Sequence, residues 1–93
     1  MQVKRVNINK NEVTEFNFDV LASEFAVKNF TDSNILVCLG NFDEEKAVKI
    51  PSMFLEVISN NFNKDITNYT TKLYNKITVK AECGGEVEVR CLK

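Results

Sequence analysis

Two cysteines, Cys83 and Cys91, flank a Gly-Gly pair in the segment Glu82-Cys-Gly-Gly-Glu-Val-Glu-Val-Arg-Cys91. Thiolates bind structural zinc and carry redox chemistry, so this segment is the first candidate for a chemical site. The spacing is not C-x-x-C, and the third cysteine, Cys38, lies far away in the chain. Zinc would need a carboxylate as its fourth ligand here, which is uncommon in structural sites. We therefore predict no metal and no cofactor.

Catalytic residue types are also scarce. The chain contains no histidine, the commonest general base and the usual activator of a serine or cysteine nucleophile. Glycine occurs only three times, so no phosphate-binding loop or dinucleotide motif can be written. The acidic run from Phe42 to Lys46 lacks the alternating oxygen ligands and the central glycine of an EF-hand. The sequence therefore predicts that the protein is not an enzyme.

The composition, 44% hydrophobic and 27% charged, is typical of one folded domain, which we assign to residues 1–93. The 12 basic and 13 acidic residues are spread along the chain without a basic block, so we expect no nucleic-acid partner. No window approaches the roughly 18 apolar residues of a membrane span, and the N-terminus lacks the apolar segment of a secretory signal. We expect a protein of the cytoplasm, or of a particle assembled there, with no membrane partner.

The C-terminal segment that carries Cys83 and Cys91 is predicted to be a β-hairpin over residues 76–92. Directly paired residues of an antiparallel hairpin share a face, so apolar residues should oppose apolar residues. A three-residue loop, residues 83–85, satisfies this rule and pairs Ala81 with Val87, Val79 with Val89 and Ile77 with Cys91. Gly85 would supply the positive φ at the end of the loop. Cys83 is then a loop residue and Cys91 a core residue.

Further short strands are predicted upstream. Residues 25–29 and 35–39 flank a polar turn and are predicted to form a second hairpin. Residues 15–20 alternate, with Phe16, Phe18 and Val20 on one face.

Residues 46–50 are predicted to form a strand that ends at Pro51, which suits an edge strand. Residues 53–58 fit either a strand or a helix that begins at Pro51, and we favour the strand. Residues 60–72 read as the longest loop. The fold class is therefore all-β, a small β-sandwich or barrel of six to eight short antiparallel strands.

Five phrases of the sequence occur in a familiar order. They are Val27-Lys-Asn-Phe-Thr-Asp-Ser-Asn-Ile-Leu-Val37, the turn Phe42-Asp-Glu44, Val48-Lys-Ile-Pro51, Lys76-Ile-Thr-Val-Lys80 and Gly84-Gly-Glu-Val-Glu-Val-Arg90. Over roughly residues 25 to 92 the chain resembles small structural proteins of tailed phages and prophages, with their V-x-N-x-(T/S)-D hairpin, I-P strand and terminal G-x-V-x-V hairpin. The resemblance implies a non-catalytic β-sandwich of the virion, assembled in the bacterial cytoplasm, often a decoration or auxiliary protein of the capsid. It transfers no catalytic residues.

Such a protein would bind the major capsid protein or another virion protein, and would form a homo-oligomer or an array on the particle. Residues 1–10 are a candidate N-terminal arm for pairing with a neighbour, with an ordinary first strand as the alternative. The candidate interface residues are Lys4, Arg5, Phe42, Phe54, Ile58, Phe62 and Tyr69. Two other functions stay open: a carbohydrate- or surface-binding module of a phage fibre or tail, and an inhibitor of a host enzyme.

Overall fold

The computed structural model describes residues 2–59 and 73–92, and these residues form eight strands and no helix. The prediction of an all-β fold is confirmed. The strands are β1 (Val3–Ile8), β2 (Val13–Ala22), β3 (Glu24–Asn29), β4 (Ile35–Leu39), β5 (Val48–Ile50), β6 (Leu55–Ser59), β7 (Tyr74–Ala81) and β8 (Gly85–Cys91).

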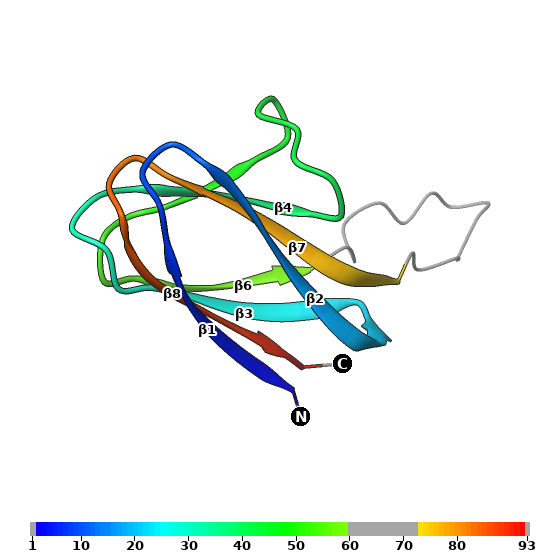
Figure 1. Cartoon of the computed structure of the whole chain (residues 1–93). Helices are drawn as coiled ribbons and strands as arrows, with labels where there is room; N and C mark the ends of the chain where they lie inside the picture. Colours follow the sequence, from blue (N-terminus) through cyan, green and yellow to red (C-terminus); the bar gives the residue numbers. More distant parts are fainter. Residues whose placement is uncertain (1, 60–72, 93) are drawn as a thin grey trace.

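The strands form two four-stranded antiparallel sheets that face each other (Figure 1). Sheet A has the order β1-β8-β3-β6, and sheet B has the order β2-β7-β4-β5. The chain crosses from one sheet to the other at nearly every connection, and among the described strands only β4 and β5 are both consecutive and paired. Eight strands in this order define a jelly roll, a sandwich of two sheets built from two Greek keys.

Both predicted hairpins are wrong in their pairing. Strand β7 pairs with β2 and β4 in sheet B, whereas β8 pairs with β1 and β3 in sheet A. Likewise β3 and β4 lie in opposite sheets. The error has a simple cause: apolar residues that share a face can meet as neighbours in one sheet or across the core from the other sheet. The six apolar residues of the predicted pairs are all buried, as expected, but they pack between the sheets.

The core fills the space between the two sheets. Strands β3, β4, β7 and β8 contribute most of its fully buried side chains, because they are central strands. Phe18 of β2 and Phe25 of β3 bring their rings to 5.7 Å across the sandwich. Val20, predicted to share the face of Phe16 and Phe18, is exposed where the pairing of β2 with β7 is irregular.

The edge strands of the two sheets carry much of the exposed surface. In sheet A, β1 and β6 are the edges, and residues 3–8 are thus an ordinary first strand of their own sheet. Residues 55–59 form a strand, as favoured over the helix. Strand β5 is an edge of sheet B and ends immediately before Pro51, where the missing N–H of proline removes no ladder hydrogen bond.

Candidate interaction surface

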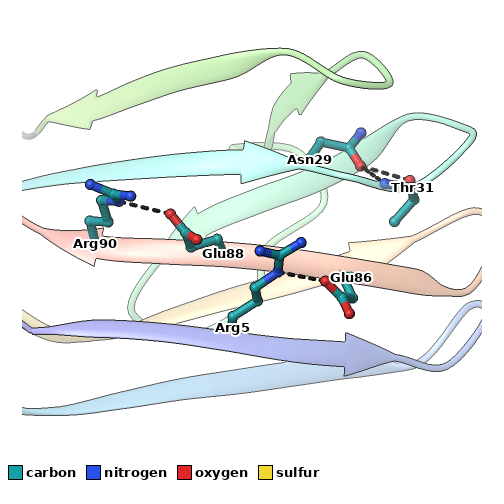
Figure 2. Close-up of polar contacts among 6 residues, drawn as sticks. All are labelled: Arg5, Asn29, Thr31, Glu86, Glu88 and Arg90. Carbon is teal, nitrogen blue, oxygen red and sulfur yellow. Dashed lines mark hydrogen bonds and ion pairs between the residues drawn. The ribbon is translucent and has the colours of Figure 1, made fainter.

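A buried asparagine organises one end of the sandwich. The Oδ1 atom of Asn29 accepts hydrogen bonds from the backbone N–H of Thr31 at 2.8 Å and from its hydroxyl at 2.7 Å (Figure 2). The Nδ2 group of Asn29 donates to the carbonyl oxygens of Ser33 at 2.8 Å and Ile50 at 3.0 Å. Asn29 therefore joins the end of β3, the β3–β4 turn and the end of β5. Within the described part of the chain, no buried side-chain nitrogen or oxygen lacks a partner.

The same asparagine holds the turn between β5 and β6 through its backbone. Its N–H donates to the carbonyl of Phe54 at 3.0 Å, and its carbonyl accepts from the N–H of Met53 at 2.8 Å. Ser52 adds a hydrogen bond from its hydroxyl to the carbonyl of Thr31, and the Lys28 ammonium donates to the carbonyl of Met53. The turn is thus anchored to β3 and to the β3–β4 turn on one side.

Met53 occupies an unusual backbone conformation in this turn. The N–H of Phe54 donates to the carbonyl of Pro51 at 3.2 Å, and Met53, the third residue, has φ +66°. This is the pattern of a type II turn, in which the third position is normally glycine. The left-handed region costs an ordinary residue about 1–2 kcal/mol. The surrounding hydrogen bonds hold Met53 there and turn both Met53 and Phe54 toward solvent.

Apolar side chains continue from this turn along the outer face of β6. Strand β6 alternates, with Leu55 and Val57 pointing outward and Ile58 pointing into the core. The fractional exposures of the outward set are 55% for Met53, 58% for Phe54, 53% for Leu55 and 47% for Val57. We call these four residues the apolar margin. Contiguous exposed apolar residues on an edge strand are a feature of interaction surfaces.

Charged side chains of β1 and β8 occupy much of the remaining outer face of sheet A. Arg5 Nε lies 2.5 Å from Glu86 Oε2, and Arg90 Nε lies 2.7 Å from Glu88 Oε1 (Figure 2). The Arg5 guanidinium also lies 4.2 Å from the centre of the Phe30 ring. Exposed ion pairs contribute at most about 1 kcal/mol each, so their main effect is to keep this face polar beside the apolar margin.

The predicted interface residues do not gather into one surface. Lys4 and Arg5 lie on β1, which is separated from β6 by β8 and β3. Arg5 points outward, whereas Lys4 points toward the inside of the sandwich, with its Nζ 5.8 Å from the centre of the Phe18 ring. Phe42 is half-buried in the β4–β5 connection.

The other four candidates have three different outcomes. Phe54 is exposed in the apolar margin, as an interface residue should be. Ile58 is only 6% exposed and belongs to the core, so its choice as an interface residue is corrected. Phe62 and Tyr69 lie outside the described residues.

Sequence reasoning missed Met53, Leu55 and Val57. Their alternation is visible in the sequence, and a strand with this pattern leaves one face open to solvent or to a partner. The pattern did not say which face, because both faces carry apolar residues. In the structure Ile58, which lies opposite Phe25, is buried in the core, and Leu55 and Val57 are exposed on the outer face.

The cysteines do not form a site together. Cys83 is exposed, Cys38 and Cys91 are buried, and all three thiols are free. Burial raises the pKa of the Cys91 thiol, which keeps it in the unreactive protonated form. The Cys38 sulfur lies 3.2 Å from the carbonyl oxygen of Asp43, so its thiol donates to the β4–β5 connection. In residues 2–59 and 73–92 no three His, Cys, Asp or Glu side chains are grouped so as to hold a metal ion.

A cavity of about 500 Å³ opens between β4 and β6 at the side of the sandwich. Asp43 and Glu56 contribute carboxylates, Lys46 an ammonium group and Tyr74 an aromatic ring. Apolar residues, among them Val37 and Ile58, also line the cavity. The cavity can accept a small polar molecule that also presents an apolar face.

No family model matches the chain, and no curated protein or solved structure matches it significantly. In the described residues there is no helix long and apolar enough to cross a membrane.

Proposed function

We propose that the protein is a non-enzymatic structural subunit of a bacteriophage virion, a capsid decoration or auxiliary subunit that binds the major capsid protein or another virion protein. The observation that carries this proposal is the turn at Met53 and Phe54. It displays two large apolar side chains in a conformation that one of them enters only at an energetic cost.

A strained, exposed apolar turn has little value to an isolated domain. Glycine at position 53 would relieve the backbone, and polar residues would suit the solvent better. A partner that covers the turn buries the apolar side chains, and the rigid turn loses little entropy on binding, which offsets the cost of the left-handed backbone. Hydrogen bonds between the turn and the backbone of Asn29 and Thr31 hold the turn in this shape before the partner arrives.

The resemblance to phage proteins and the architecture agree with this proposal. The V-x-N-x-(T/S)-D and I-P phrases contain Asn29, Thr31 and Ile50, the residues that anchor the exposed turn. Jelly rolls are frequent in viral capsid domains, although they also occur in lectins and cupins, so the fold supports the proposal only by analogy. A small interface is sufficient on a particle, because repeated copies bind with combined strength.

Quantitative mass spectrometry of density-purified phage particles from the strain that encodes the chain tests the proposal. We expect copies in fixed proportion to the major capsid protein. Met53→Ser with Phe54→Ser should abolish incorporation, whereas Val20→Ser with Leu21→Ser, at exposed apolar residues of β2, should not. Absence of the natural chain from particles would refute the proposal, and co-purification with one host protein would then favour the inhibitor.

A carbohydrate-binding module is the second candidate, and the cavity favours it. Glu56 and Asp43 provide hydrogen-bond acceptors for sugar hydroxyls, and Tyr74 provides an aromatic ring. A glycan that binds there should raise the melting temperature of the natural protein, and Glu56→Gln should reduce that shift. A glycan panel that leaves the melting temperature unchanged would remove this candidate.

A further inference from the structure

Strands β1 and β6, the two edges of sheet A among the described strands, carry charges of opposite sign at equivalent positions. Lys4 of β1 lies opposite Val89, Val89 lies opposite Val27, and Val27 lies opposite Glu56 of β6. These four residues form one row across the sheet, which we call the charged row. Among the described strands β1 and β6 each pair on one side only, so Lys4 and Glu56 stand at the two open ends of the row.

Both charges point toward the inside of the sandwich. Val27 and Val89, between them in the row, are completely buried, and residues of one row share a face of the sheet. The Lys4 ammonium lies over the Phe18 ring, and Glu56 lines the cavity between the sheets. Inward charges on edge strands are a known protection against unwanted strand pairing, because a partner strand would trap an unpaired charge.

Opposite signs at the two edges make one pairing favourable. All neighbours in sheet A are antiparallel, so β1 and β6 run in opposite directions. A second copy placed in line with the first therefore presents its β1 antiparallel to the β6 of the first. If the rows continue, Glu56 meets Lys4 of the second copy, and two charges that are exposed in the single chain become an ion pair.

The adjacent row supports the same register. Val3 lies opposite Arg90, Arg90 opposite Ala26, and Ala26 opposite Val57. Continuation of this row places Val57 beside Val3 of the second copy on the outer face. Both valines are about half exposed, at 47% and 48%, and each would cover the other.

We propose that this chain associates with a second copy of itself, head to tail, through antiparallel pairing of β6 with β1 in the register that continues the rows of sheet A. Pairing of like edges is disfavoured. Two β1 strands bring Lys4 against Lys4 or against an apolar residue, and two β6 strands do the same with Glu56. A head-to-tail contact repeats from copy to copy, giving a ring or an open row of subunits.

The inference goes beyond the proposed function, because it concerns contacts between copies whatever larger partner binds the apolar turn. It predicts association of the purified chain in the absence of any particle. Met53→Ser with Phe54→Ser should leave that association intact. Association between copies and incorporation into a particle can therefore fail separately.

Cysteine cross-linking tests the register directly. In a Cys83→Ser background, one chain carries Val3→Cys and another carries Val57→Cys. Mild oxidation of the mixture should give a covalent dimer, because directly opposed residues have Cβ atoms about 4.5–5.5 Å apart, and a small shift of the two strands brings them to the roughly 3.5–4.5 Å of a disulfide. Each variant alone should stay monomeric on a non-reducing gel. Arg90→Cys with Val57→Cys is the matched control: Arg90 is exposed in the same row but lies one strand farther in, and should not cross-link.

A charge exchange provides the second test. Lys4→Glu alone or Glu56→Lys alone should weaken association about tenfold in sedimentation velocity, because each places like charges opposite one another. The double variant restores an opposite pair and should recover association. Unchanged melting temperatures would establish that all three variants are folded.

Three outcomes would overturn the proposal. The first is a natural chain that stays monomeric at its highest soluble concentration and gives no mixed cross-link. The second is a dimer from Val57→Cys alone, which would mean pairing of two β6 strands. The third is a double charge variant that is no better than the single variants.

Discussion

Asn29 Oδ1 lies 2.8 Å from the backbone nitrogen and 2.7 Å from the hydroxyl oxygen of Thr31, and accepts a hydrogen bond from each. Both residues are almost completely buried, at 0% and 2% exposure. Buried polar groups stabilise a fold only when their partners are all present. This pair meets that condition and connects the turns at one end of the sandwich.

Asn29→Ala should destabilise the protein by about 3 kcal/mol, because it removes the hydrogen-bond partners of the Ile50 carbonyl and the buried Thr31 N–H. Thr31→Val should cost about 1–2 kcal/mol, because the shape is kept and only the hydroxyl is lost. Thr31→Ser, which keeps the hydroxyl, is the control. The free energies come from urea unfolding. In the double variant the two losses should not add, because the residues share hydrogen bonds; additive losses would contradict the network.

Gly85→Ala should be far more destabilising than Gly84→Ala. Gly85 has φ +150°, and a Cβ there would lie 2.9 Å from Thr31 Cγ2 and 3.2 Å from Thr31 Cα. A Cβ at Gly84 would instead meet the Ile8 carbonyl oxygen at 3.1 Å, with no unusual φ. We expect a loss of about 2 kcal/mol or more at Gly85 and less than about 1 kcal/mol at Gly84, measured by thermal and urea unfolding. Equal losses would argue against the close approach of β8 to Thr31.

Met53→Gly should leave stability unchanged or raise it by up to about 1 kcal/mol. Relief of the left-handed backbone is offset in part by the greater freedom of glycine in the unfolded chain. Leu21→Gly, at an equally exposed residue of β2 with ordinary φ, should instead be destabilising. Thermal unfolding measures both. A clear loss of stability in Met53→Gly would mean that the methionine serves the fold rather than a partner.

One thiol per folded chain should react rapidly with Ellman's reagent. Cys83 is exposed, whereas Cys38 and Cys91 are buried and the pKa of Cys91 is raised by its burial. All three should react once the protein is unfolded in guanidinium chloride. Cys83→Ser should remove the rapid phase completely. A second rapidly reacting thiol in the folded natural chain would contradict the burial of Cys38 or Cys91.

The sequence alone was sufficient for several local features. Alternation identified the strands and placed Val79, Val89 and Cys91 in the core, and it also favoured a strand after Pro51. It also assigned a positive φ to Gly85 and an exposed position to Cys83. These features depend on a residue and its immediate neighbours, which is why a pattern can reveal them.

Strand pairing was decided only by the tertiary structure. Alternation states which face of a strand is buried, but β7 and β8 can bury the same faces as a hairpin or as members of opposite sheets. The same limit applies to β6, where both faces are apolar and only the space beside Phe25 selected Ile58 for the core. The charged row, likewise, exists only because β8 and β3 lie between β1 and β6. Pairing is a choice among distant partners, and its free energy depends on how all eight strands pack at once.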